Sequence, residues 1–197
     1  MNFGCQLLAP NGFANLRADE RYYFLKTDDS LRRVTLAVFT TQHKGRRIRI
    51  VRIEKELFQI GIAKNLIVTA EEQRMLPVWL GRVENENLHL TDLKRTGVAK
   101  TNASRAEQRF GYIVGLLPRL NEIVLAENPF EIINKHARSI TPKQNRTRLA
   151  EWFFAYVCHS FQLAALWPEY PNVGTYDKTD EKFNETHFGK LAIEKGR

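Results

Sequence analysis

The stretch PFEIINKHARSITPKQNRTRLAEWFFAYVCHS, residues 129–160, carries the clearest fold signal in the chain. Its beginning predicts a helix, because Asn128 is a favourable cap and Pro129 fits the first helical position, where an N–H would go unpaired anyway. Glu131 suits the positive end of the helix dipole. Residues at helical spacing form the apolar face of this helix: Phe130, Ile133, Ala137 and Ile140.

A second helix is predicted to begin at Thr141, after a very short turn. Thr141, Pro142 and Gln144 form a capping box with a proline at the first helical position. Its later turns are apolar, with Leu149, Trp152, Phe153, Tyr156 and Val157 at helical spacing. Two helices joined by a tight turn, the second with a polar and cationic start, are typical of a helix-turn-helix that enters the major groove of DNA.

Another helix is predicted upstream of this pair. Ser104 and Glu107 form a capping box before the apolar residues Phe110, Ile113, Val114 and Leu117. Pro118 interrupts the helical pattern, so residues 121–126 form either a separate turn of helix or part of a bent one. The helical region therefore covers residues 104–167.

The first hundred residues have the pattern of strands. Strands are expected at residues 21–26, 33–39 and 46–53, and the second places Val34, Leu36 and Val38 on one face. The third alternates Arg47 and Arg49 with Ile48 and Ile50, which predicts a hairpin with one apolar and one cationic face. A short helix over 54–60 and a strand over 65–69 complete a β-rich unit that could form an open barrel.

These patterns predict an α+β fold with four regions. We expect a small β-rich domain over 1–81, a connection over 82–103, a helix-turn-helix domain over 104–167 and an extended basic tail over 168–197. The tail is rich in proline, glycine and charged residues, which disfavours a packed core. Its abrupt end at Lys195–Arg197 suggests that the chain continues in a longer protein.

The composition of the chain limits the classes of partner that it could bind. The 197 residues include 30 Lys and Arg against 22 Asp and Glu, a net charge of +8 that favours phosphate backbones or anionic surfaces. There is no apolar run long enough to span a membrane and no secretory signal at the start, so we expect a cytoplasmic protein without membrane partners. Cys5 and Cys158 lie far apart and the histidines are scattered, so no metal site is predicted.

Two groups of residues are candidates for DNA contact. The first is the start of the predicted recognition helix, where Gln144 and Asn145 could read adenine and Arg146 or Arg148 guanine, beside Lys143. The second group consists of hairpin cations that could contact phosphates or a minor groove: Lys44, Arg46, Arg47, Arg49 and Arg52. The alternative interpretation makes the hairpin arginines a solvated sheet face and the helix start an ordinary polar turn.

No catalytic residue is predicted. The chain contains no Gly-rich phosphate loop and no G-x-S-x-G motif, and its adjacent acidic pairs, Asp28–Asp29 and Glu71–Glu72, lie in expected turns or helix starts. Whether the chain belongs to an enzyme therefore stays open. The competing hypothesis is a non-catalytic adaptor or transcription-regulator-like protein whose helix-turn-helix is only structural.

The order of these features resembles the amino-terminal region of TnsB-type DDE transposases, relatives of the phage Mu transposase. In that family a recognition helix ends in an aromatic stretch, followed by an AL-P step and a basic linker containing glycine. The corresponding segments here are Trp152–Tyr156, Ala165–Pro168, and Gly174 through HFGKLAIEKGR at residues 187–197. The likeness covers residues 105–197, and the first hundred residues match only in general layout.

The resemblance implies sequence-specific binding of double-stranded DNA at transposon ends, with other transposition proteins as possible partners and a nucleoid-associated location. In the family, a later RNase H-like domain with three carboxylates and divalent metal joins the strands. That domain would follow residue 197, so no cofactor is expected in this chain.

Overall fold

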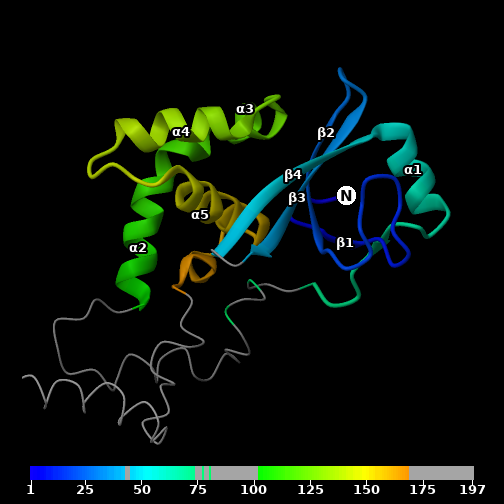
Figure 1. Ribbon diagram of the computed structural model, residues 1–197, viewed down its shortest axis with the longest axis horizontal. Coiled ribbons are helices and arrows are strands. Elements are labelled where there is room, and N and C mark those ends of the chain that lie inside the picture. The colour runs from blue at the N-terminus through cyan, green and yellow to red at the C-terminus, as the bar shows by residue number, and fades with distance from the viewer. Residues whose placement is uncertain (43–44, 74–76, 78–79, 81–101, 169–197) are drawn as a thin grey trace, which may run out of the picture.

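The computed structural model describes residues 1–42, 45–73, 77, 80 and 102–168 (Figure 1). Within them the fold is α+β, as expected: one antiparallel sheet packs against a group of helices. The predicted connection, apart from its last two residues, and the predicted tail, apart from Pro168, lie outside the described residues.

The sheet has five strands in the order β4-β3-β2-β1-β5. Its strands are β1 (Gln6–Leu8), β2 (Tyr22–Asp28), β3 (Arg33–Gln42), β4 (Gly45–Glu54) and β5 (Val68–Thr69). The β3–β4 hairpin pairs Gln42 with Gly45 at its tip and Arg33 with Glu54 at its base. The strands predicted from alternation are therefore confirmed. The sequence analysis missed β1, because three residues are too few to show a period of two.

Both faces of the sheet are apolar, which corrects the predicted cationic face of the hairpin. One face carries Tyr23, Leu25, Ala37, Phe39, Ile48 and Ile50. The other carries Tyr22, Phe24, Val34, Leu36, Val38, Val51 and Ile53. The alternation of Arg47 and Arg49 with isoleucines does not extend past Ile50, because Val51 and Ile53 lie on the face of those arginines and are buried.

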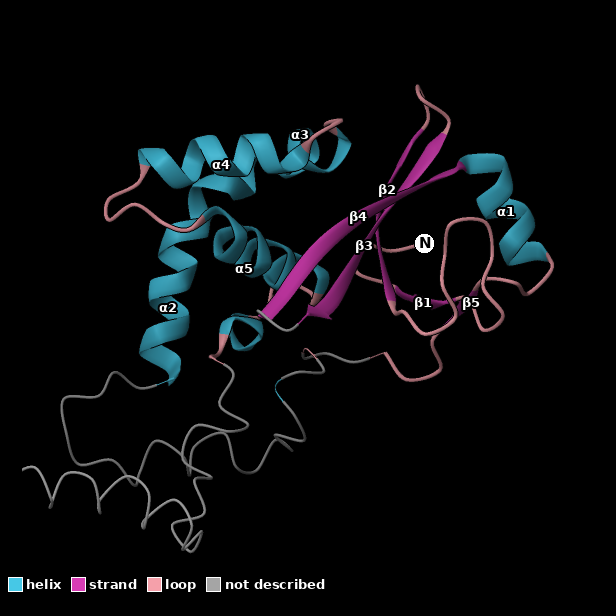
Figure 2. Ribbon diagram, viewed as in Figure 1, coloured by secondary structure: helices cyan, strands magenta, loops and turns pink. Residues whose placement is uncertain are grey.

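Helix α1 (Lys55–Ala63) and the segment that contains Phe13 and Leu16 cover the second face (Figure 2). Phe58 of α1 packs into the cluster that includes Val51 and Ile53 of β4. Gly61 of the same helix is required by a close approach, since a Cβ atom there would lie 2.7 Å from Ile67 Cδ1. The barrel suggested by the sequence is instead an open sheet that is covered on both sides.

The remaining helices cover the first face. They are α2 (Asn102–Ile113), the 3-10 helix η2 (Val114–Arg119), α3 (Leu120–Leu125), α4 (Pro129–Ser139), α5 (Arg146–Cys158) and the 3-10 helix η3 (Leu163–Leu166). Pro118 lies in η2 and separates α2 from α3, and Pro129 occupies the first position of α4, as the sequence predicts. Helix α2 begins at Asn102, so Ser104 lies inside it rather than capping it.

Sheet and helices share one hydrophobic cluster. Tyr23, Leu25, Ala37 and Ile48 of the sheet belong to the same buried cluster as Phe153, Phe154 and Val157 of α5. Figure 1 shows α5 lying between the sheet and helices α2 and α4. The predicted boundary near residues 81–103 therefore separates two kinds of secondary structure, but these two parts share a core. The four-domain division itself stays a prediction.

Candidate nucleic-acid interface

The predicted start of the second helix is wrong by five residues: α5 begins at Arg146 rather than Thr141. Asn145 is its cap, since the side-chain oxygen accepts hydrogen bonds from the backbone N–H groups of Thr147 and Arg148 at 2.9 and 3.3 Å. Residues 140–145 instead connect α4 to α5, and the backbone N–H of Gln144 donates to the Ala137 carbonyl at 3.1 Å. The connection is thus longer than the very short turn expected.

This geometry changes the roles of the two predicted adenine readers. The amide of Gln144 donates to the Pro142 carbonyl at 3.0 Å, and the amide oxygen of Asn145 is occupied by the helix start. Bidentate recognition of adenine uses both the donor and the acceptor of such an amide. In this structure both amides already take part in hydrogen bonds within the connection or at the helix start.

Three of the predicted cations are still candidates for DNA contact near the start of α5. Lys143, Arg146 and Arg148 are exposed, and no acidic residue lies between residues 140 and 150. Leu149 and Ala150 directly after them are buried, so the helix is anchored in the core while its first turn faces solvent. We call Lys143, Arg146 and Arg148 the basic start of α5.

The hairpin arginines have mostly structural partners. Arg46 forms an ion pair with Glu151 of α5 at 2.7 Å, and both side chains are largely buried, with 13% and 16% of their surface exposed. Arg49 pairs with Glu20. Arg52 donates to the carbonyl oxygens of Ala126 and Glu127, which follow α3. Three of the five predicted hairpin cations therefore have partners within the fold.

Of the predicted hairpin cations, Arg47 is exposed, and Lys44 lies outside the described residues. The partners of Arg46, Arg49 and Arg52 are remote from them in sequence: Glu151, Glu20 and Glu127. Local pattern therefore could not distinguish these arginines from Arg47.

Sequence reasoning missed two arginines of α2, Arg105 and Arg109. The Arg109 guanidinium lies 5.1 Å from the centre of the Trp152 ring and donates to the Leu166 carbonyl at 2.8 Å. Burial lowers the pKa of Arg109, Glu151 opposes that shift, and the positive charges of Arg46, Arg105 and Arg148 lower it further. The spacing of four between Arg105 and Arg109 was the available signal, because it places both on one helical face.

The aromatic residues of α5 belong to the core, as the sequence predicts. Phe153 is fully buried, and the partly buried Trp152 and Tyr156 pack against the same cluster. Trp152 stacks on Tyr112 of α2 with 6.2 Å between ring centres. These rings join α2 to α5 and fix the direction of the basic start of α5.

The two histidines of the helical region are also structural. The Nε2 atom of His136 lies 2.9 Å from the Tyr112 carbonyl oxygen. His159 is buried, its Nδ1 atom lies 2.9 Å from the Ala155 carbonyl oxygen, and burial lowers its pKa to about 4.

Among the described residues, no three His, Cys, Asp or Glu side chains are grouped so that they could hold a metal ion. The same part of the chain contains no helix with the length and apolar character needed to cross a membrane. Neither a comparison with known protein families nor one with curated proteins finds a match to this chain.

Proposed function

We propose that this chain binds double-stranded DNA through the basic start of α5, with α4 and α5 acting as a helix-turn-helix pair. The observation that carries the proposal is the exposed run from Lys143 to Arg148, which holds three cations and no acid at the beginning of a core-anchored helix. A rigid helix with a solvated cationic first turn has the properties needed to enter a major groove.

The position of these cations supports an anionic partner. The first turn of a helix is the positive end of its dipole, where each cation costs about 0.3–1 kcal/mol in the absence of an anion. The first turn of α5 contains no acidic residue that would offset this cost. Phosphate groups would offset it, because helix N-termini and guanidinium groups both favour anions.

Within this proposal, the residues divide into two roles. Arg146 and Arg148 are the candidates for reading guanine in the major groove, and Lys143 contacts phosphate. Arg47 is an exposed hairpin cation that contributes a contact independent of base sequence. We do not propose DNA contacts for Arg46, Arg49 and Arg52, because their guanidinium groups have partners within the fold.

The biological site rests on the resemblance to the amino-terminal region of TnsB-type transposases. On that basis the DNA is the end of a transposon, and strand joining, with its divalent metal, belongs to a domain outside this chain. Other transposition proteins are the expected protein partners. The competing proposal, an adaptor whose helix pair is only structural, predicts no affinity for duplex DNA.

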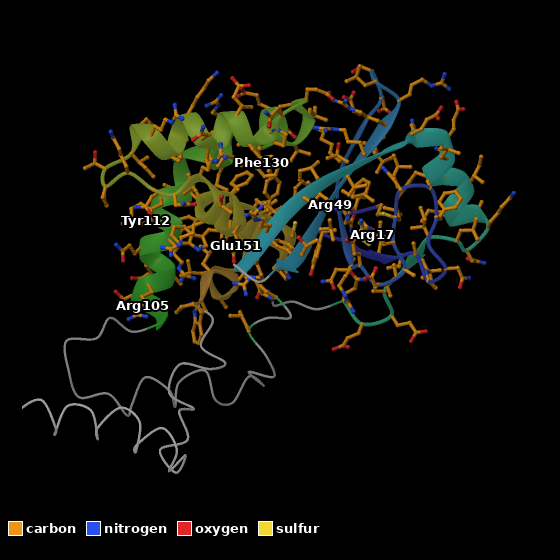
Figure 3. The ribbon with its side chains drawn as sticks, in the orientation of Figure 1. Arg17, Arg49, Arg105, Tyr112, Phe130 and Glu151 are labelled. Carbon is orange, nitrogen blue, oxygen red and sulfur yellow. The ribbon has the colours of Figure 1, made fainter. Side chains whose placement is uncertain are left out.

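Titration of the whole chain against fluorescent duplexes at several salt concentrations tests the proposal. Affinity should fall linearly with salt on a double-logarithmic scale, with a slope of about −0.9 for each phosphate contacted. Arg146→Ala should weaken discrimination among sequences by about 1–3 kcal/mol. Arg17→Ala is the control, because Arg17 is exposed on the other side of the sheet (Figure 3).

Footprinting on the ends of the element that encodes the protein tests the biological site. Protection of repeated sites at those ends is expected. Failure to bind any duplex, or an affinity that salt does not change, would contradict DNA binding and favour the adaptor.

A further inference from the structure

The last turn of α4 carries an exposed arginine on the side of the connection to α5. Arg138 lies in this turn, and its side chain faces solvent. None of the residues that the structure describes forms an ion pair or a hydrogen bond with its guanidinium group. Arg138 was not among the candidates for DNA contact, because it lies before the predicted recognition helix.

The connection between α4 and α5 folds back onto this turn. The backbone N–H of Gln144 donates to the Ala137 carbonyl at 3.1 Å. Lys143 directly precedes this donor, and Arg138 directly follows this acceptor. Standard bond lengths therefore place the Cα atoms of Lys143 and Arg138 within about 9 Å of each other. Lys143 is exposed as well, so two cations from different segments lie on neighbouring parts of the surface.

Packing and capping hold the connection in this position. Ile140 packs against the main hydrophobic cluster, and its backbone N–H donates to the His136 carbonyl at 3.2 Å. At the other end of the connection, the Asn145 side chain caps α5. The backbone that carries Arg138 and Lys143 is therefore ordered before a ligand binds, which lowers the entropic cost of binding.

Positive charge continues from α4 through the connection into α5. Residues 132–150 contain no Asp or Glu and five basic residues: Lys135, Arg138, Lys143, Arg146 and Arg148. Lys135 pairs with Glu131 at 3.1 Å, one turn before Arg138. The other four cations lie on three consecutive segments, and an extended polyanion matches such an arrangement better than a single small anion does.

The helix dipole accounts for part of the position of Arg138. A cation in the last turn of a helix is stabilised by the negative end of the dipole, whether or not a ligand binds. Lys64, directly after α1, has the same relation to a helix end and is also exposed. Figure 1 shows α1 on the other side of the sheet from α4 and α5. Lys64 is therefore a matched control for Arg138.

We propose that Arg138 contacts the phosphate backbone of DNA beside Lys143, which makes the last turn of α4 part of the DNA interface. A guanidinium group can donate two parallel hydrogen bonds to phosphate oxygens. Phosphate contacts fix the position of a protein on the duplex without reading its sequence. Arg138 and Lys143 thus hold the duplex while Arg146 and Arg148 meet the bases. The inference rests on the proposed function and adds a contact from α4.

The salt dependence of duplex binding tests the inference. Arg138→Gln should reduce the slope of log affinity against log salt by about one unit. Between roughly 50 and 200 mM salt, the affinity of the unaltered protein should fall about 3.5-fold more than the affinity of this variant. The Arg138→Gln effect should be the same for every duplex sequence, whereas the effect of Arg146→Ala should depend on the sequence.

Two further variants separate the phosphate contact from effects on the helix end. Arg138→Lys keeps the positive charge and should retain the slope. Lys64→Gln removes a cation from another helix end and should leave the slope unchanged. If the unaltered protein binds DNA but Arg138→Gln has the same slope as Lys64→Gln, the inference is overturned and the proposed function stands. If the unaltered protein binds no duplex, the proposed function fails and the inference fails with it.

Discussion

At the scale of single residues, two side chains whose residue types suggest a functional role have structural contacts instead. Asn145 has the amide of an adenine reader, yet its oxygen caps α5. His159 has the imidazole of a catalyst or a metal ligand, yet it lies against the rings of Tyr23 and Phe39, with ring centres 5.1 and 6.2 Å away. In both cases a local hydrogen bond or a packing contact determines the role of the side chain.

The burial of His159 should make the protein sensitive to mild acid. Its pKa is about 4 in the fold, whereas an unfolded histidine has a pKa of about 6.5. Between these values the unfolded chain binds a proton that the folded chain does not, so the free energy of unfolding decreases as pH falls. The loss should reach about 2 kcal/mol near pH 5 and about 3 kcal/mol near pH 4.

Urea unfolding of the whole chain between pH 7 and pH 5 measures this effect. His159→Gln should have a flatter pH profile than the unaltered protein, whatever its stability at neutral pH. Carboxylates whose pKa is lowered by hydrogen bonds, such as Glu122 with Arg119, lose their stabilisation only below about pH 4.5 and do not interfere. Equal losses in both proteins over this range would contradict the prediction.

At the scale of elements, the β3–β4 hairpin holds the end of α3. Arg33 donates to the Leu125 carbonyl at 3.0 Å, and Arg52 donates to the carbonyls of Ala126 and Glu127. Carbonyl groups at a helix end lack partners within the helix, and a cation there also suits the negative end of the dipole. These contacts attach α3 to the sheet.

Arg52→Ala should therefore lower the free energy of unfolding by about 2 kcal/mol, the range for hydrogen bonds that involve a charged group. Arg47→Ala is the matched control, because the same residue type lies exposed on the same strand and its removal should change stability by less than about 0.5 kcal/mol. Denaturant midpoints of the two variants provide the comparison. A similar cost for both would show that Arg52 is only a surface cation.

The elements also show where sequence reasoning succeeds and where it stops. The periods of β3, β4 and α4 were sufficient to predict them, since alternation and a proline at the first helical position are local properties. Extending the Arg47–Ile50 pattern along β4 predicts the wrong character for one face of the strand. Val51 and Ile53 lie on the same face as Arg47 and are apolar. Apolar residues at both parities indicate a strand that is covered on both sides.

The candidate interface was predictable to a similar extent. Lys143, Arg146 and Arg148 were identified because charge runs are visible in a sequence. The helix start was misplaced because Thr141 and Asn145 both satisfy local capping rules, and packing of the connection onto α4 selects Asn145. Arg109 was missed because its contacts with Trp152 and the Leu166 carbonyl exist only once α2 has packed against α5 and η3.

At the scale of the whole molecule, the shared core predicts that sheet and helices unfold together. Leu25 of β2 is 1% exposed and lies in the cluster that contains the α5 aromatics. Leu25→Ala should lower the free energy of unfolding by about 2–5 kcal/mol, because it leaves a cavity between the two layers. Since both layers lose contacts at that cavity, the signals of sheet and helix should shift by the same amount.

Thermal unfolding followed by far-ultraviolet circular dichroism, with hydrogen exchange of β3 and α5 amides, measures both layers in one protein. Leu57→Ala is the control, because Leu57 on α1 is 41% exposed and its removal should have little effect. Two separate transitions, with helical signal retained after the sheet has melted, would contradict the shared core. Coincident transitions would mean that the basic start of α5 keeps its orientation only while the sheet is folded, because α5 packs against β4 through Arg46 and Glu151.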